Sequence, residues 1–179
     1  MHIRQLALHY DAPADRLLLR VRSSDDGVFA VWLTRRLCLR LWPHLSRLVQ
    51  QLGTAQAVAR ALPNATPTAQ AASMLGAAAR QQALQQADFS QPFKDAAAHQ
   101  PLGSEPLLAH TVQLTPQPSG QLQVTILDAR QRSMQMVLDD TLAIAVRELM
   151  ASALRQADWA IGLEAPAQAI ETAAPRTLN

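Results

Sequence analysis

The feature that most constrains this chain is a weak internal repeat with an offset of 105 residues, relating residues 1–52 to residues 107–160. Three groups of apolar residues coincide: Leu17, Leu19 and Val21 with Leu122, Val124 and Ile126; Phe29, Val31 and Leu33 with Met134, Met136 and Leu138; and Leu37, Leu39 and Leu41 with Leu142, Ile144 and Val146. A further, looser match relates Leu6 or Leu8 to Leu107 or Leu108 and departs from the offset of 105. A repeated unit that cannot bury its apolar face alone is expected to pack against its copy.

Each copy has the pattern strand, turn, strand, helix. The apolar residues Leu17, Leu19 and Val21 alternate with a second set, as in a half-buried strand, and three of the four members of that set (Arg16, Leu18, Arg20 and Arg22) are arginines. Asp25-Asp26-Gly27 predicts a tight turn, because Asp-Gly readily adopts the positive φ angles of short hairpins. A further strand precedes each hairpin, at residues 6–10 and 107–114. The sequence therefore predicts an α+β domain in which two antiparallel three-stranded meanders form a β-sandwich-like head.

A helix is expected to follow each meander. Thr34 and Asp139 are suitable N-caps, which predicts helices over residues 35–52 and 141–160. Pro43 should kink or restart the first helix. Because Leu37, Leu39 and Leu41 also alternate, an alternative interpretation continues the preceding strand through Leu41.

The two copies are separated by an alanine- and glutamine-rich stretch, residues 54–88, which predicts a projecting helical hairpin. Pro63 and Pro67 divide this stretch into helices at about 54–61 and 68–88. Residues 1–163 then form a single domain, and residues 164–179 form a disordered tail. The apolar contacts of the hairpin are expected from Val58, Leu62, Met74, Leu75 and Leu84.

The 179 residues are 49% hydrophobic, which suffices for one compact core. The single cysteine, Cys38, excludes an internal disulfide and is expected to be a small buried thiol. The five histidines have no metal-binding spacing, and the aspartate pairs fit turn and capping roles. With no glycine-rich phosphate loop and no nucleophile elbow, we expect a non-enzymatic protein without a metal or cofactor. The absence of a signal-like or membrane-spanning segment predicts a cytoplasmic protein, and the bias towards arginine and alanine suggests a bacterial source.

The last predicted helix has an apolar face about 140° wide, whereas a surface helix needs only about 100°. The excess width suggests an interaction module that forms a homodimer through this helix. The expected interface residues are Leu142, Val146, Leu149, Met150, Ala153, Leu154 and Ala157.

Positive charge is concentrated in the first third of the chain. Residues 1–60 contain nine arginines and four aspartates, and residues 61–179 contain seven basic and ten acidic residues. Such a face can be a solvated sheet surface or can bind an acidic protein or, less readily, nucleic acid. The candidate basic face consists of Arg16, Arg20, Arg22, Arg36 and Arg40.

Two resemblances accompany these patterns. The segment Val31-Trp32-Leu33-Thr34-Arg35-Arg36-Leu37 resembles one found in uncharacterised bacterial proteins. The segment Ser133–Leu138 followed by Ala145–Leu149 resembles the last strand and exit helix of the head domain in the DNA end-joining scaffold that partners ligase IV and in centriolar scaffolds. The second resemblance implies a β-sandwich-like head that dimerises near the exit helix. Those scaffolds continue into a long coiled coil, whereas this helix is predicted to stop near Ile161.

Overall fold

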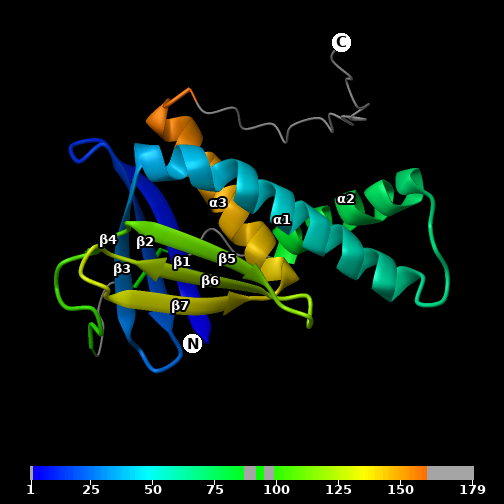
Figure 1. Cartoon of the computed structure of the whole chain (residues 1–179), viewed down its shortest axis with the longest axis horizontal. Helices are drawn as coiled ribbons and strands as arrows, with labels where there is room; N and C mark the ends of the chain where they lie inside the picture. The colour runs from blue at the N-terminus through cyan, green and yellow to red at the C-terminus, as the bar shows by residue number, and fades with distance from the viewer. Residues whose placement is uncertain (1, 87–91, 95–98, 161–179) are drawn as a thin grey trace, which may run out of the picture.

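The computed structural model describes residues 2–86, 92–94 and 99–160 and has the predicted α+β class. A helical hairpin separates two groups of strands, and a helix follows the second group (Figure 1). The helices are α1 (Arg35–Ala61), α2 (Ala69–Gln86) and α3 (Asp140–Ala157). The strands are β1 (Ile3–Asp11), β2 (Arg16–Ser23), β3 (Val28–Thr34), β4 (Leu107–Leu108), β5 (Thr111–Pro116), β6 (Leu122–Leu127) and β7 (Ser133–Leu138).

The two predicted meanders are present as two separate sheets. The first sheet has the order β1-β2-β3-β4 and the second has the order β5-β6-β7, with all pairs antiparallel except β3 with β4. In Figure 1 the strands of the two sheets run across each other, with α1 and α3 alongside them. The inward-facing residues of both sheets and the apolar faces of α1 and α3 form one continuous core. Each sheet therefore buries its apolar face in the same shared core.

The hairpins of the two copies have the same register. Leu17 pairs with Leu33 in the first, and Leu122 pairs with Leu138 in the second, which preserves the offset of 105. Their turns also match: the amide of Asp26 donates to the carbonyl of Ser23 over 3.1 Å, and that of Gln131 to the carbonyl of Asp128 over 3.2 Å. Asp26 and Gln131 have positive φ angles of 61° and 63°. The turn chemistry predicted at Asp26 is therefore observed in both copies.

The predicted strand over residues 107–114 is wrong as a single element. Its first two residues form β4, which pairs in parallel with β3, and the second sheet starts only at Thr111. Leu107 is fully buried beside Val31, so this short segment serves the first sheet. The match of Leu6 and Leu8 to Leu107 or Leu108 is therefore wrong, because Val112 and Leu114 occupy the equivalent places: Leu6 pairs with Val21 and Val112 with Ile126.

Both predicted N-caps are present. Thr34 Oγ1 accepts a hydrogen bond from the amide of Leu37 over 3.3 Å, and Asp139 Oδ1 accepts one from Leu142 over 2.8 Å. The first helix is longer than predicted, because α1 continues through Pro43 and includes the segment 54–61 that was expected as a separate helix. The alternative of a strand through Leu41 is excluded. Buried residues on both sides of the proline, such as Trp42 and Leu45, hold the helix in place where one backbone bond is lost.

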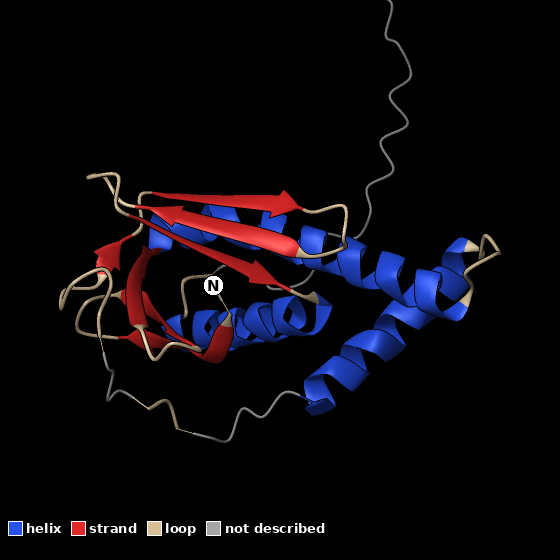
Figure 2. Cartoon of the chain, turned by 90° about the horizontal axis from the view of Figure 1, so that it is seen from below, coloured by secondary structure: helices blue, strands red, loops and turns tan. Residues whose placement is uncertain are grey.

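The hairpin formed by α2 and the second half of α1 projects beyond the sheets (Figure 2). Of the large side chains expected to pack it, Leu62 is 37% exposed and Met74 is 68% exposed, so this part of the prediction is wrong. Leu84 does pack against the core as predicted, Val58 and Leu75 are partly buried, and the fully buried residues of the hairpin are the alanines Ala57 and Ala83. Small side chains let helices approach closely but bury little area each.

Two ion pairs connect the hairpin to α3. Arg60 binds Asp140 over 2.8 Å and Arg80 binds Glu148 over 2.6 Å. The end of the predicted domain, residues 161–163, and the predicted tail, residues 164–179, lie outside the described residues. No helix within the described ranges is both long enough and apolar enough to cross a membrane.

Equivalent leucines of the two copies should contribute equally to stability. Leu33 and Leu138 are 3% and 0% exposed and lie in the same core. Leu33→Ala and Leu138→Ala should each lower the free energy of unfolding by about 2–5 kcal/mol, because each leaves a cavity. Met74→Ala, at an exposed position, should change it by less than about 0.5 kcal/mol. Urea denaturation measures all three, and a loss confined to one leucine would contradict the single shared core.

Candidate functional site: a basic cleft

The residues of the predicted dimer interface are buried or partly buried within one copy of the chain. Val146, Met150, Ala153, Leu154 and Ala157 of α3 are between 1% and 9% exposed. Leu142 is partly buried against the same core, and Leu149 is also partly buried. The wide apolar face of α3 is therefore explained by contacts on several sides, with β1, β7, α1 and α2. The width that suggested dimerisation is used for folding, and we do not retain this helix as an interface.

The structure divides the predicted basic face into two groups, of which the first lies on β2. The guanidinium of Arg20 stacks over the ring of Phe93, 4.7 Å from its centroid. Arg22 is 9% exposed, pairs with Asp26 over 3.0 Å and donates to the carbonyl of Lys94 over 2.8 Å. Arg16 is half-buried at the start of the strand. Arg20 and Arg22 therefore hold residues 93 and 94 against the sheet and are not free to bind a partner.

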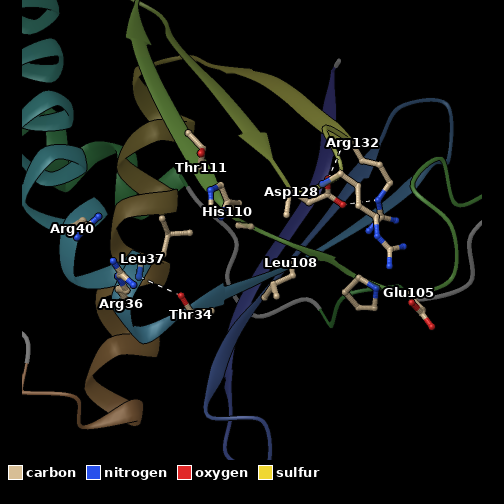
Figure 3. Close-up of a pocket in the computed structure, with 14 residues that line it drawn as sticks. Thr34, Arg36, Leu37, Arg40, Glu105, Leu108, His110, Thr111, Asp128 and Arg132 are labelled. Carbon is tan, nitrogen blue, oxygen red and sulfur yellow. Dashed lines mark hydrogen bonds and ion pairs between the residues drawn. The ribbon is translucent and has the colours of Figure 1, made fainter.

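The second group, Arg36 and Arg40, lies on the first turns of α1 and lines a cleft of about 720 Å³. Figure 3 shows these two arginines on one side, Asp128 and Arg132 on the other, and Leu108 and His110 between them. We call this space the basic cleft. Its lining consists of Thr34, Arg36, Leu37, Arg40, Glu105, Pro106, Leu108, Ala109, His110, Thr111, Asp128, Ala129, Arg130 and Arg132.

Three separate parts of the chain build the basic cleft. Thr34 ends β3 and caps α1, so Arg36 and Arg40 start directly at the edge of the first sheet. Residues 105–111 cross from the first sheet to the second and form the floor. The β6–β7 turn brings Arg130 and Arg132 to the opposite wall. Sequence reasoning missed these two arginines, although the repeat places Arg132 at the turn position of Gly27.

Asp128 organises the wall formed by the β6–β7 turn. Its carboxylate accepts hydrogen bonds from the amides of Arg130 and Arg132, over 2.8 and 2.9 Å, and from the Arg132 guanidinium over 2.7 Å. Burial by itself raises the pKa of Asp128, but these bonds outweigh it and the pKa is lowered overall. Arg132 also donates to the carbonyl of Leu102 over 3.0 Å. Arg132 is thus a structural arginine, fixed by an ionised aspartate.

The remaining arginines of the cleft have different surroundings. Arg36, Arg40 and Arg130 are exposed, and within the described part of the chain their side chains form no ion pair. Glu105 is the other carboxylate in the lining and is also exposed. Arg35, next to Arg36, donates to the carbonyl of Trp159 over 3.2 Å. The basic cleft therefore has a surplus of unpaired positive charge at the amino-terminal end of a 27-residue helix.

The other candidate groups have structural roles. Cys38 is fully buried, and burial raises the pKa of its thiol to about 12, as expected for an inert side chain. Asp25 and Asp26 belong to the β2–β3 turn, where Asp26 binds Arg22, and Asp139 caps α3. Within the described ranges, no three histidine, cysteine or acidic side chains gather in a way that could hold a metal ion.

Comparisons with protein-family models, with curated proteins and with solved structures found no match to this chain.

The ionised form of Asp128 should stabilise the cleft wall in a pH-dependent way. Because the folded-state pKa is lowered, its contribution is complete above the ordinary value of about 3.9 and is lost as the pH falls through the lower folded value. Asp128→Asn should lower the melting temperature at neutral pH, and the difference from the unchanged protein should shrink below about pH 4. Glu105→Gln, at an exposed carboxyl outside any helix or strand, is the control. A difference that stays constant down to pH 2, measured by thermal unfolding, would contradict this role of the carboxylate.

Proposed function

We propose that this protein is a non-enzymatic interaction module that binds an acidic segment of a partner protein in the basic cleft. The observation that carries the proposal is the position of Arg36 and Arg40, which line the cleft from the positive end of α1 without an acidic neighbour in the first turn. Backbone amides at a helix start, together with arginines, favour a bound carboxylate.

The arrangement is unfavourable for folding by itself. A cation near a helix N-terminus opposes the helix dipole by about 0.3–1 kcal/mol, whereas aspartate or glutamate there would stabilise it. Arg35 has a structural purpose through its bond to Trp159, but Arg36 has no such contact among the described residues. Local rules of this kind are most often broken where a protein binds something. An acidic group in the cleft would remove the conflict.

The lining favours an acidic protein segment over nucleic acid. Nucleic acids without sequence preference are usually bound by aromatic side chains that stack on bases, along a continuous basic groove. Among the described residues that line the basic cleft there is no Phe, Tyr or Trp on which bases could stack, and the single imidazole is that of His110. Its apolar residues, including the 44% exposed Leu108, suit the side chains of a peptide. A volume of about 720 Å³ accommodates several such side chains.

Charge reversal in the cleft should weaken binding. Arg36→Glu with Arg40→Glu should weaken binding of a fluorescein-labelled oligoglutamate peptide at least about tenfold at ~50 mM salt, measured by anisotropy. The matched control is Arg47→Glu with Arg155→Glu, which changes the net charge equally at exposed positions outside the cleft. Because Arg36→Glu places an acid in the first turn of α1, the cleft variant should remain folded, which thermal unfolding checks.

The unchanged protein should bind the oligoglutamate peptide with an affinity that falls as salt rises. No binding at low salt, or equal losses in the cleft and control variants, would overturn the proposal. Tighter binding of a mixed-sequence single-stranded DNA, lost in the cleft variant alone, would assign the same arginines to nucleic acid instead.

A further inference from the structure

The second sheet has an open edge at β5. The order β5-β6-β7 leaves β5 paired on one side only, and its residues Thr111, Gln113, Thr115 and Pro116 are exposed. An edge strand presents backbone amides and carbonyls that an added strand can bind. In the first sheet, edge strand β1 packs against α3 and edge strand β4 has only two residues, whereas β5 contacts α1 and leaves a groove beside it.

A groove of about 460 Å³ lies between β5 and α1. On the helix side it is lined by Leu37, Leu41, His44 and Leu48, which are spaced three or four residues apart and so share one face of α1. Val112 and Leu114 line it from the strand. The leucines and Val112 are only partly buried against the core. A groove between a helix and a sheet edge can accept the side chains of a strand laid along that edge.

The groove and the basic cleft are continuous. They share four lining residues: Leu37, Arg40, His110 and Thr111. The shared end is the start of β5, whereas Leu48 and Leu114 line only the groove. The other strands of this sheet pair antiparallel, and antiparallel pairs are the commoner kind, so we take the added strand to run from the Pro116 end towards Thr111. Its carboxyl-terminal end would therefore arrive at Arg40 and Arg36.

We propose that the partner segment is an extended peptide that adds to β5 as an antiparallel strand, places apolar side chains in the groove beside α1, and inserts acidic residues at its carboxyl-terminal end into the basic cleft. This inference rests on the function proposed above and specifies the form and direction of the ligand. Charge complementarity selects the occupant: the apolar groove leads directly to arginines that have no ion-pair partner among the described residues.

Synthetic peptides test the direction and the strand geometry. The probe has about six residues of alternating valine and threonine, matching the length of β5, followed by three glutamates at the carboxyl end. It should bind at least about tenfold more tightly than a peptide with the glutamates at the amino end. N-methylation at alternate positions should abolish binding in one set of positions and have little effect in the other, because only every second amide faces β5.

Protein variants separate this inference from the function on which it rests. His44→Trp should fill the groove and weaken binding of the peptide, whereas Gln51→Trp, also exposed on α1 but outside the groove, should not. If the Arg36 and Arg40 double variant abolishes binding while the N-methylated sets and the two tryptophan variants behave alike, strand addition is wrong and the acidic-partner function stands. If the arginine variant has no effect, the proposed function itself fails.

Discussion

The whole structure depends on burying the apolar face of each sheet, and both halves of the chain do this in the same way. A sheet with one apolar face must bury that face against another layer of the structure. Here the inward residues of both sheets, for example Leu17 and Leu122, are fully buried in a core that includes α1 and α3. Each copy supplies one sheet and one covering helix, so neither copy is a complete domain.

The helix α3 connects the parts of this core. It contacts β1, β7, α1 and α2, and nine of its residues are buried. Its end is fixed by Trp159, whose indole nitrogen donates to Asp15 over 2.7 Å and whose ring meets Tyr10 edge-on at 5.7 Å. The hydrogen bonds from Trp159 and Tyr10 lower the pKa of Asp15. The carbonyl of Trp159 also receives a bond from Arg35, so the same tether fixes the start of α1 beside the basic cleft.

Much of the fold could be predicted from local patterns, because alternation, turn residues and N-caps act over a few residues. The hairpin register, the turn at Asp26 and the caps Thr34 and Asp139 belong to this group. What could not be predicted depended on tertiary contacts. Leu107 was assigned to the second sheet by its sequence position, yet it pairs with Val31 of the first. Likewise, the wide apolar face of α3 could be recognised in the sequence, but the sequence does not show whether another molecule or the chain's own sheets and helices cover it.

Only part of the candidate site could be predicted from the sequence, because the rest depends on tertiary contacts. Arg36 and Arg40 stand out as cations at a helix start, but Arg130 and Arg132 reach the cleft only through the packing of a distant turn. The two copies differ at this point. At the equivalent start of α3 the residue after the cap is Asp140, which suits the helix dipole and is paired with Arg60. In the first copy Arg35 takes the place of Asp140, and the next residue, Arg36, lines the basic cleft. The start of α3 therefore has an acidic residue of the chain itself beside the positive end of its dipole. The start of α1 has no acidic residue in its first turn, and it borders the basic cleft.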